Sequence, residues 1–150
     1  MGTNYQGSSK EITTLNAFIK LMRCTETLNN RLNKHLAEVN LTTSQFGTLE
    51  VLMHLGPLNQ RSIGEKLLKS GGNITMVIDN LEKIGYVVRK KDPEDRRAIL
   101  VHLTKKGKLF IKDFFPKHLE RIMDEFSVLS EEEMKSLAHI CKKMGLNKVS

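Results

Sequence analysis

The residues best suited to chemistry lie in a short charged stretch, DPEDRR, at positions 92–97. Two adjacent arginines, Arg96 and Arg97, follow three acids and a proline. Arginine binds phosphate and also enters the narrow minor groove of DNA, where the potential is most negative. Asp95 stands two residues before Arg97, so in an extended segment its carboxylate can hold the guanidinium. The stretch therefore indicates either a DNA-contacting loop whose acids orient its arginines or a solvated turn with a surface ion pair.

The positive charge of the chain is concentrated around this stretch. Its 150 residues carry a formal net charge of +7 at pH 7. Residues 60–110 hold twelve basic and six acidic residues, so +6 of that charge lies there. Such a local surplus favours an anionic partner such as nucleic acid. A basic membrane-surface or protein-binding module is an alternative, but it would carry a continuous basic run rather than cations separated by acids.

A second group of polar residues falls at helical spacing in residues 73–84. One face of this segment is apolar, and the opposite face carries side chains that can read DNA bases. Asparagine can form two hydrogen bonds with adenine, and threonine or methionine can contact a thymine methyl group. The residues on this face are Asn73, Met76, Asn80 and Lys83, with Thr75 and Asp79 at its margins. The plain alternative is the solvated side of a surface helix.

The first elements of the chain are predicted to be two helices. Apolar residues recur every three or four positions from 12 to 39, which predicts a long amphipathic helix after a loose N-terminus of about nine residues. Thr42 and Gln45 then form a capping-box pattern, and Gly56-Pro57 ends the second helix.

The middle of the chain has the order of a winged helix-turn-helix. Asn59 is the predicted N-cap of a short helix that ends at the glycine pair 71–72, and another helix runs from this turn to Gly85. Two β-branched runs, YVVRKK and AILVHL, flank the charged stretch and predict a hairpin. A helix, a glycine turn, a second helix and a hairpin wing together are typical of a DNA-binding module.

The C-terminal part is predicted to be two further helices. Thr104 can cap the first, which Pro116 should bend, and Ser130 with Glu133 forms a capping box for the second. The apolar positions of the last helix, expected to face inward, are Met134, Leu137, Ile140, Cys141 and Met144. The terminal helices need more apolar surface than a small lobe supplies, so the sequence predicts a dimer in which two copies bury each other.

The run from Leu41 to Thr104 resembles the MarR family of bacterial winged-helix transcription regulators, above all in DPEDRRAILVHLT followed by KKGK. GEKLLKSGGNIT, DNLEKIGYVVRK and FPKH are similar to the branch that answers quinones, phenols or oxidants. The resemblance implies a mainly α fold in one domain, 1–150, with a winged helix-turn-helix lobe at 41–104 that has a small β-hairpin wing. Dimerisation helices would occupy 10–40 and 105–147. It further implies a homodimeric repressor, released from a palindromic operator by a small ligand or by thiol oxidation.

Residue chemistry and resemblance together give the expected contacts with double-stranded DNA. The major-groove residues are Ser70, Asn73, Thr75, Met76 and Asn80. The wing residues are Asp95, Arg96 and Arg97, and the phosphate contacts are Lys69, Lys90 and Lys91. Many family members carry arginines on the reading helix where this chain has Met76 and Asn80. Its readout should therefore depend more on shape, van der Waals contact and the wing.

An effector pocket between the dimer helices and the lobe is implied by the resemblance alone. By that analogy its lining residues are Cys24, Leu28, Phe46, Leu49 and Met53. Arg23 immediately precedes Cys24 in the sequence, but on a helix it points elsewhere, so the sequence favours buried packing for Cys24 over a thiol sensor. Cys141 has the spacing of a core residue.

Other functions find little support in the sequence. It has no P-loop, dinucleotide fingerprint or GxSxG motif, so neither an enzyme nor a cofactor is predicted. The five histidines have no metal-ligand spacing. Two distant cysteines without a CxxC, and no long apolar run or signal peptide, favour a cytoplasmic protein. The remaining alternative is a basic, non-enzymatic interaction protein that uses the winged helix for protein or non-specific nucleic-acid contacts.

Overall fold

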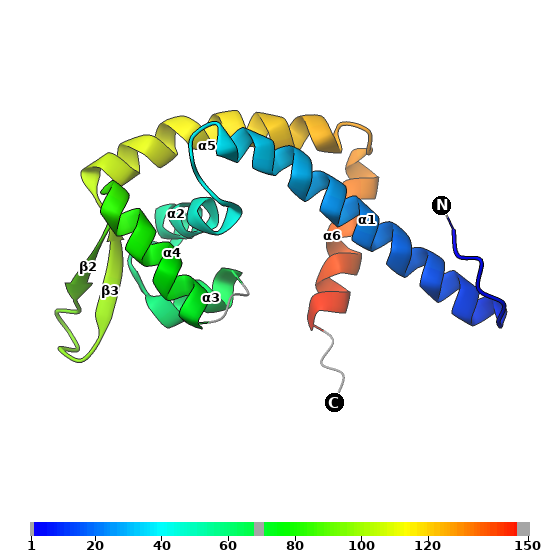
Figure 1. Cartoon of the computed structure of the whole chain (residues 1–150), viewed down its shortest axis with the longest axis horizontal. Helices are drawn as coiled ribbons and strands as arrows, with labels where there is room; N and C mark the ends of the chain where they lie inside the picture. The colour runs from blue at the N-terminus through cyan, green and yellow to red at the C-terminus, as the bar shows by residue number, and fades with distance from the viewer. Residues whose placement is uncertain (1, 68–70, 147–150) are drawn as a thin grey trace.

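The computed structural model of the chain describes residues 2–67 and 71–146. These residues form six α-helices and one three-stranded antiparallel sheet (Figure 1). The helices are α1 (Ser9–Ala37), α2 (Thr43–Leu55), α3 (Gln60–Leu67), α4 (Gly71–Ile84), α5 (Lys105–Phe126) and α6 (Glu131–Leu146). The strands are β1 (Leu58–Asn59), β2 (Val87–Lys91) and β3 (Ile99–Leu103). This order confirms the predicted mainly α, winged helix-turn-helix fold.

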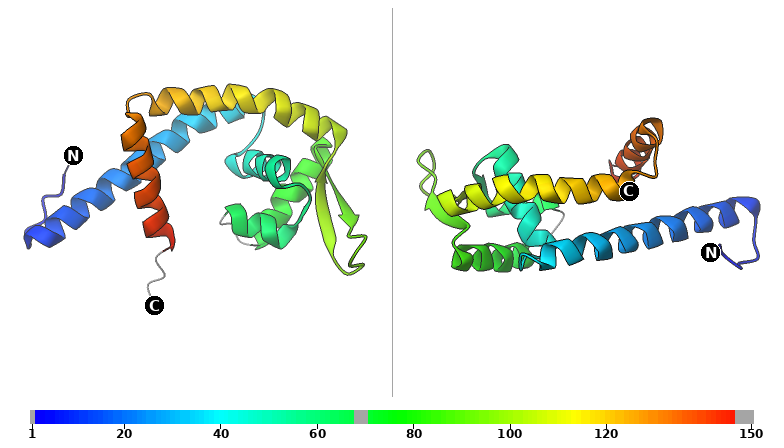
Figure 2. Two further views of the ribbon diagram at one scale, coloured as in Figure 1. Left: turned by 180° about the vertical axis from the view of Figure 1, so that it is seen from behind. Right: turned by 90° about the horizontal axis from the view of Figure 1, so that it is seen from above.

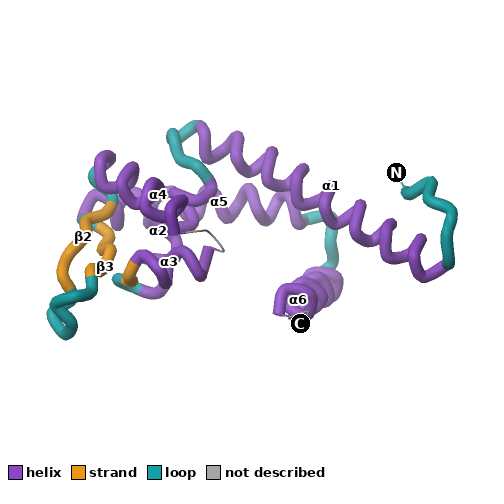
Figure 3. Tube along the Cα trace, turned by 60° about the horizontal axis from the view of Figure 1, so that its bottom comes forward, coloured by secondary structure: helices purple, strands orange, loops and turns teal. Residues whose placement is uncertain are grey.

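The molecule has a lobe and an arm. The lobe, residues 41–104, contains α2, α3, α4 and the sheet, while the arm consists of α1, α5 and α6 (Figure 1). The β2–β3 hairpin lies at the end of the lobe that is farthest from α6 (Figure 3). The hairpin is thus presented away from the helices of the arm.

Local capping signals fix the helix starts that the sequence predicted. The Thr42 hydroxyl accepts a hydrogen bond from the Gln45 N–H at 3.2 Å, and the Gln45 side chain accepts one from the Thr42 N–H at 2.9 Å. Ser130 and Glu133 form the same reciprocal pair ahead of α6, at 3.2 and 2.8 Å. Each box satisfies backbone donors that the first turn of a helix leaves unpaired.

The N-terminal segment is more ordered than the sequence predicted. Ser8 and Glu11 form a third capping box, so α1 begins at Ser9 rather than at the first apolar residue of the stripe. The Thr3 N–H donates to Asn16 Oδ1 at 2.8 Å, which folds the preceding residues back along α1. Residues 2–8 form no helix or strand, so α1 begins close to where the sequence predicted, and the polar cap at Ser8 sets its first residue.

The helix-turn-helix agrees with the prediction at Asn59 and differs from it in two details. Asn59 caps α3 as expected, since its Oδ1 accepts a hydrogen bond from the Ser62 N–H at 2.8 Å. The pair Gly71-Gly72, predicted to be the turn, instead begins α4. The two-residue strand β1 was not predicted, because it is too short to show an alternating pattern; it pairs with β3 through Leu58 and Val101.

The core of the lobe is assembled from one face of each element. Ile63 of α3, Ile74 and Ile78 of α4 and Leu49 of α2 are completely buried, and Val101 closes the core from the sheet. Each buried aliphatic side chain of this kind contributes about 1.5–3 kcal/mol relative to exposure. This packing fixes which face of α4 is left in water.

The arm leaves its apolar stripes uncovered within one chain. α5 continues through Pro116 and curves above the lobe, as predicted (Figure 1). Seen from above, α6 lies on the far side of α5 from α1 (Figure 2). Over its whole described length α6 buries no side chain, so the expected inward packing is wrong for a single chain. The exposed side chains that were predicted to pack are Met134, Leu137, Ile140, Cys141 and Met144.

Two aromatic rings and two imidazoles, here called the junction cluster, connect the arm to the lobe. The cluster consists of His35 of α1, Phe46 of α2, and Phe114 and His118 of α5. The His118 ring lies 4.5 Å from the Phe46 ring, and its Nδ1 is 3.2 Å from Nδ1 of His35. Two such nitrogens share one hydrogen only when one imidazole donates and the other accepts.

Within the junction cluster, His118 is harder to protonate than an exposed histidine, because its pKa is lowered. Its side chain is only 4% exposed, and this burial lowers its pKa below the ordinary value. A positive charge on the neighbouring His35 would repel a second charge and lowers the pKa further. His118 therefore stays neutral at pH values at which an exposed histidine takes up a proton.

At Gly107, helix α5 lies directly against the backbone of Tyr86, the residue before β2. The Thr104 hydroxyl donates to the Gly85 carbonyl at 2.6 Å and accepts from the Gly107 N–H at 3.0 Å. A Cβ atom at position 107 would lie 2.0 Å from the Tyr86 carbonyl oxygen, so no side chain fits.

We expect Gly107→Ala to lower the free energy of unfolding by about 1–3 kcal/mol, because backbone atoms must move apart to admit the methyl group. Gly72→Ala is the matched control, since a Cβ there meets nothing within 4 Å. Urea unfolding at one fixed protein concentration would measure both. Equal stability of the two variants would show that the Tyr86 contact relaxes freely.

The lowered pKa of His118 predicts an acid-sensitive fold. The unfolded histidine takes up its proton near pH 6.5, and the folded one does so only at lower pH. Between these two pKa values the unfolded state binds more protons, so the free energy of unfolding falls as the pH drops below about 6.5.

Melting temperatures between pH 7.5 and 5.5 would test this prediction. His118→Phe, which keeps a stacked ring but cannot titrate, should flatten the decrease. His139→Asn, on the exposed α6, should leave the decrease unchanged. The prediction fails if the phenylalanine variant loses stability on acidification as steeply as the wild type.

Candidate nucleic-acid interface

Helix α4 presents to solvent the polar face that the sequence predicted. Its apolar side, with Ile74 and Ile78 at zero exposure, packs into the lobe. Asn73 and Met76 are exposed on the other side, the latter at 65%, and Asn80 is half-buried. Met76 places a large apolar side chain on this surface, and its flexible thioether adapts well to a contact surface. The face can therefore make both amide hydrogen bonds and apolar contacts.

Two of the predicted contact residues, Lys69 and Ser70, lie outside the described residues. Thr75 and Asp79 are exposed at the margin of the face, one helical turn apart. The Thr75 hydroxyl accepts a hydrogen bond from Gln60 Nε2 at 2.5 Å, so it is held from the side of α3.

The wing tip is an ordered turn between β2 and β3. The Asp92 N–H donates to the Ala98 carbonyl, and the Ala98 N–H donates to the Asp95 carbonyl, both at 2.9 Å. Five consecutive residues at the tip, 93–97, are exposed and include both predicted arginines. The charged stretch is therefore held at the end of the hairpin, as the sequence predicted.

The role predicted for Asp95 is corrected by the structure. Its Oδ1 accepts from the backbone N–H of Arg97 at 3.0 Å. Among the described residues its carboxylate forms no ion pair with the Arg97 guanidinium. The prediction assumed an extended segment, whereas the chain turns here, and in a turn a short acidic side chain reaches the backbone two residues on. Asp95 thus orders the loop rather than the guanidinium itself.

Two further cations lie next to the wing tip. Lys90 and Lys91 are exposed at the end of β2, and within the described part of the chain neither ammonium group has an acidic partner. They lie on the same lobe as the exposed face of α4. Their unneutralised charges suit contacts with phosphate.

A network centred on Arg89 was missed by the sequence analysis. Its guanidinium, on β2, contacts Asp79 of α4 at 2.7 Å and Glu82 at 3.6 Å, and donates to Gln60 Oε1 at 3.3 Å. One signal could have indicated it. Arg89 stands two residues after the buried Val87, so strand alternation places a charge on the inward side, where it needs partners.

The five predicted effector residues do not gather in one place. Phe46 lines a cavity of about 260 Å³ among α1, α2 and α5, together with Glu50, His118 and Ile122. Leu49 is buried in the core of the lobe and Leu28 is half-buried on α1; neither borders this cavity.

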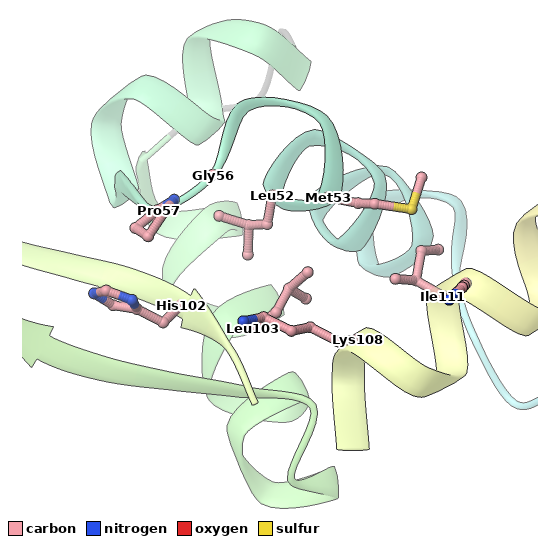
Figure 4. A pocket seen from close by; sticks show the side chains of 9 residues that line it. Leu52, Met53, Gly56, Pro57, His102, Leu103, Lys108 and Ile111 are labelled. Atoms are coloured by element: carbon pink, nitrogen blue, oxygen red, sulfur yellow. The ribbon is translucent and has the colours of Figure 1, made fainter. Parts of the chain in front are cut away.

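Met53 borders a second cavity instead, of about 410 Å³. It lies between the end of α2, strand β3 and the start of α5, with Leu52, Leu103 and Ile111 around it (Figure 4). Lys108 and Lys112 complete its lining on the α5 side. Of the five predicted effector residues, Phe46 and Met53 thus border two different cavities, and Cys24, Leu28 and Leu49 border neither.

Both cysteines are exposed and free in the single chain. The predictions of a buried Cys24 and a core Cys141 were wrong, because the helices that carry them lack a covering surface within one chain. Of the described helices, none is long and apolar enough to cross a membrane. No group of three potential metal ligands occurs in residues 2–67 and 71–146.

Comparison with known proteins gives the family context. The MarR family profile matches residues 41–99, which span most of the lobe. The chain is 39% identical over 134 residues to the HTH-type transcriptional regulator MhqR of Bacillus subtilis, which covers 89% of this chain and 92% of that protein.

Solved structures agree in fold along nearly the whole chain. Sco3205, a MarR family regulator from Streptomyces coelicolor in complex with DNA, superposes with a TM-score of 0.84 at 20% identity, covering 99% of this chain and 95% of that one. BpsR of Bordetella bronchiseptica, whose DNA binding is regulated by 6-hydroxynicotinic acid, gives 0.82 at 20% identity, with 97% and 100% covered. These relatives are regulators and not enzymes. The chain belongs to the MarR family of DNA-binding, winged helix-turn-helix transcriptional regulators.

Proposed function

We propose that this protein is a homodimeric, cytoplasmic repressor that binds a pseudo-palindromic operator and is released by a small phenolic or quinone-like ligand. The observation that carries the proposal is the pairing, on one lobe, of an exposed reading face on α4 with a cationic, ordered wing. A helix in the major groove and a wing on the flanking backbone or minor groove use both features at once.

The proposed DNA contacts follow from the chemistry of each position. Asn73 and Asn80 offer amides to base edges, and Met76 and Thr75 offer apolar groups to thymine methyls. Arg96 and Arg97 would enter the minor groove from the wing tip, whose backbone Asp95 orders. The phosphate contacts proposed are Lys69, Lys90 and Lys91, with Ser70 at the start of the reading helix.

The arm supports a dimer as the functional unit. Exposed apolar side chains line α1, α5 and α6, among them Phe18, Leu119, Met123 and Ile140. Single exposed apolar residues are common, but stripes along three helices indicate an interaction surface. A second copy of the chain carries the same stripes, and a twofold pair would bury both sets and present two lobes to one face of a duplex.

The cavity beside the junction cluster supports a small aromatic effector. Phe46 and Ile122 provide apolar walls, while His118 and Glu50 provide polar groups that can bind a phenolic hydroxyl. The structural relative BpsR answers a hydroxylated aromatic acid. Because the cavity lies where arm and lobe meet, a bound ligand could change the spacing of the two lobes.

Thiol oxidation is the second route of release. Cys24 is exposed on α1, and an accessible thiol can be oxidised or alkylated. Its predicted packing role loses support from this exposure in the single chain.

We expect Asn80→Ala to weaken binding by about 1–3 kcal/mol and to relax the base preference at the positions facing α4. The target would be a duplex selected from random DNA by the wild-type protein, and anisotropy titration with footprinting would measure both effects. Lys117→Ala, which removes a cation from the arm, is the control. A wild-type footprint without two related half-sites, or an unchanged preference in Asn80→Ala, would contradict the proposed reading face.

The two routes of release can be separated with a hydroquinone and its quinone. Under anaerobic, reducing conditions the hydroquinone cannot alkylate a thiol, so release of operator DNA must be non-covalent. We expect the hydroquinone to release operator DNA from the wild type and from Cys24→Ser to the same extent. It should act poorly on Ile122→Trp, in which the indole fills the cavity. If only the quinone acts, and Cys24→Ser resists it, the thiol route is correct.

A further inference from the structure

We propose that Arg89 is a positioning residue, which fixes the reading face of α4 relative to the wing and thereby sets sequence preference rather than binding phosphate itself. The inference rests on the proposed function, in that α4 reads bases while the wing contacts the flank. It concerns a side chain that lies beneath the DNA face and not on it.

The Arg89 guanidinium forms ion pairs with two acidic residues of α4. It contacts Asp79 Oδ1 at 2.7 Å and Glu82 Oε2 at 3.6 Å. The Arg89 backbone N–H also donates to Glu82 Oε2 at 3.1 Å, so strand and helix are joined by main chain as well as side chain. The planar guanidinium holds such partners in fixed directions, which a lysine ammonium would not do.

Gln60 extends the network to a predicted base contact. Its Oε1 accepts from Arg89 Nη2 at 3.3 Å, while its Nε2 donates to the Thr75 hydroxyl at 2.5 Å. The oxygen and the nitrogen of the Gln60 amide therefore each form a hydrogen bond. Thr75 and Asp79, one turn apart on the margin of the reading face, are connected to the same arginine from the side of the lobe.

Exposure separates Arg89 from the neighbouring cations of its strand. Its side chain is 25% exposed, whereas Lys90 and Lys91 are exposed. To bind a phosphate, the guanidinium would have to leave Asp79, Glu82 and Gln60. It would also leave two carboxylates on α4 without a counter-charge near the DNA. Both effects favour retention of the network in the complex.

The network joins two contact elements that must fit the duplex together. β2 leads directly into the wing, and α4 lies beside it (Figure 1). Major-groove and minor-groove contacts form at once only when helix and wing keep one relative placement. Loss of the network should therefore reduce discrimination between sequences more than it reduces attraction to DNA.

Two variants break the network without changing net charge. Gln60→Leu removes both amide bonds, and the double variant Arg89→Met with Asp79→Asn removes the ion pair while taking away one charge of each sign. Lys90→Ala on the same strand is the matched control for a phosphate contact. Affinity for the selected operator and for a scrambled duplex would be titrated at several salt concentrations, and circular dichroism would verify folding.

For both network variants we expect the ratio of operator to scrambled affinity to fall by about tenfold, with the salt dependence unchanged. Lys90→Ala should instead weaken both duplexes equally and reduce the salt slope by about 1. An unchanged ratio in Gln60→Leu, which tolerates the loss of a half-buried amide, would overturn the inference even if the double variant failed to fold.

The same titrations separate this inference from the proposed function. If the wild type itself shows no preference for any duplex, or Asn80→Ala leaves the preference intact, α4 is not the reader. If the wild type does prefer its operator and Asn80→Ala loses that preference, but the network variants lose affinity for both duplexes with a smaller salt slope, Arg89 contacts phosphate and its positioning role is wrong.

Discussion

The contact between Phe46 of α2 and the rings of Phe114 and His118 on α5 joins the lobe to the arm, and the arrangement of the rest of the molecule depends on it. These rings are buried and tilted against one another, so a small shift of one displaces the others. The lobe carries the DNA face, and the arm carries the apolar stripes. The junction cluster therefore lies between the two parts of the molecule, and the cavity lined by Phe46 and His118 lies beside it.

Much of the fold could be predicted because its signals are local. Capping boxes at Thr42 and Ser130, the N-cap at Asn59 and the β-branched runs on either side of the wing each depend on residues a few positions apart. Within the lobe, periodicity also identified the buried face of α4. Such features are decided by backbone hydrogen bonding and by alternation, both of which can be read within a short window of sequence.

The features that sequence reasoning missed are contacts between distant residues. Gln60, Thr75 and Arg89 meet only because α3, α4 and β2 pack together, and no short pattern encodes their order in space. The stacking of His35 on His118 joins positions 83 residues apart. The prediction for the wing failed in a different way: its charged residues do lie at the hairpin tip, but an extended segment was assumed where Asp95 turns the chain.

The effector residues were assigned by analogy, and this explains why they scatter. Phe46 and Met53 border different cavities, because side chains seven positions apart on α2 face the same side but lie two turns apart along the helix. The cavity at the junction is lined jointly by residues of α1, α2 and α5, which lie far apart in the sequence. Chain-local reasoning can suggest the helix that lines such a site but not the residues that close it.

The exposed apolar side chains of α6 bear on how long a newly made chain survives in the cell. A chain that has left the ribosome exposes Met134, Ile140 and Met144 to water until another surface covers them. Exposed apolar helices are what chaperones and proteases recognise, so if the proposed dimer covers α6, unassembled chains should be removed faster than assembled ones. The amount of this regulator in a cell would then rise more steeply than its rate of synthesis, because the surviving fraction grows with the chance of meeting a second chain.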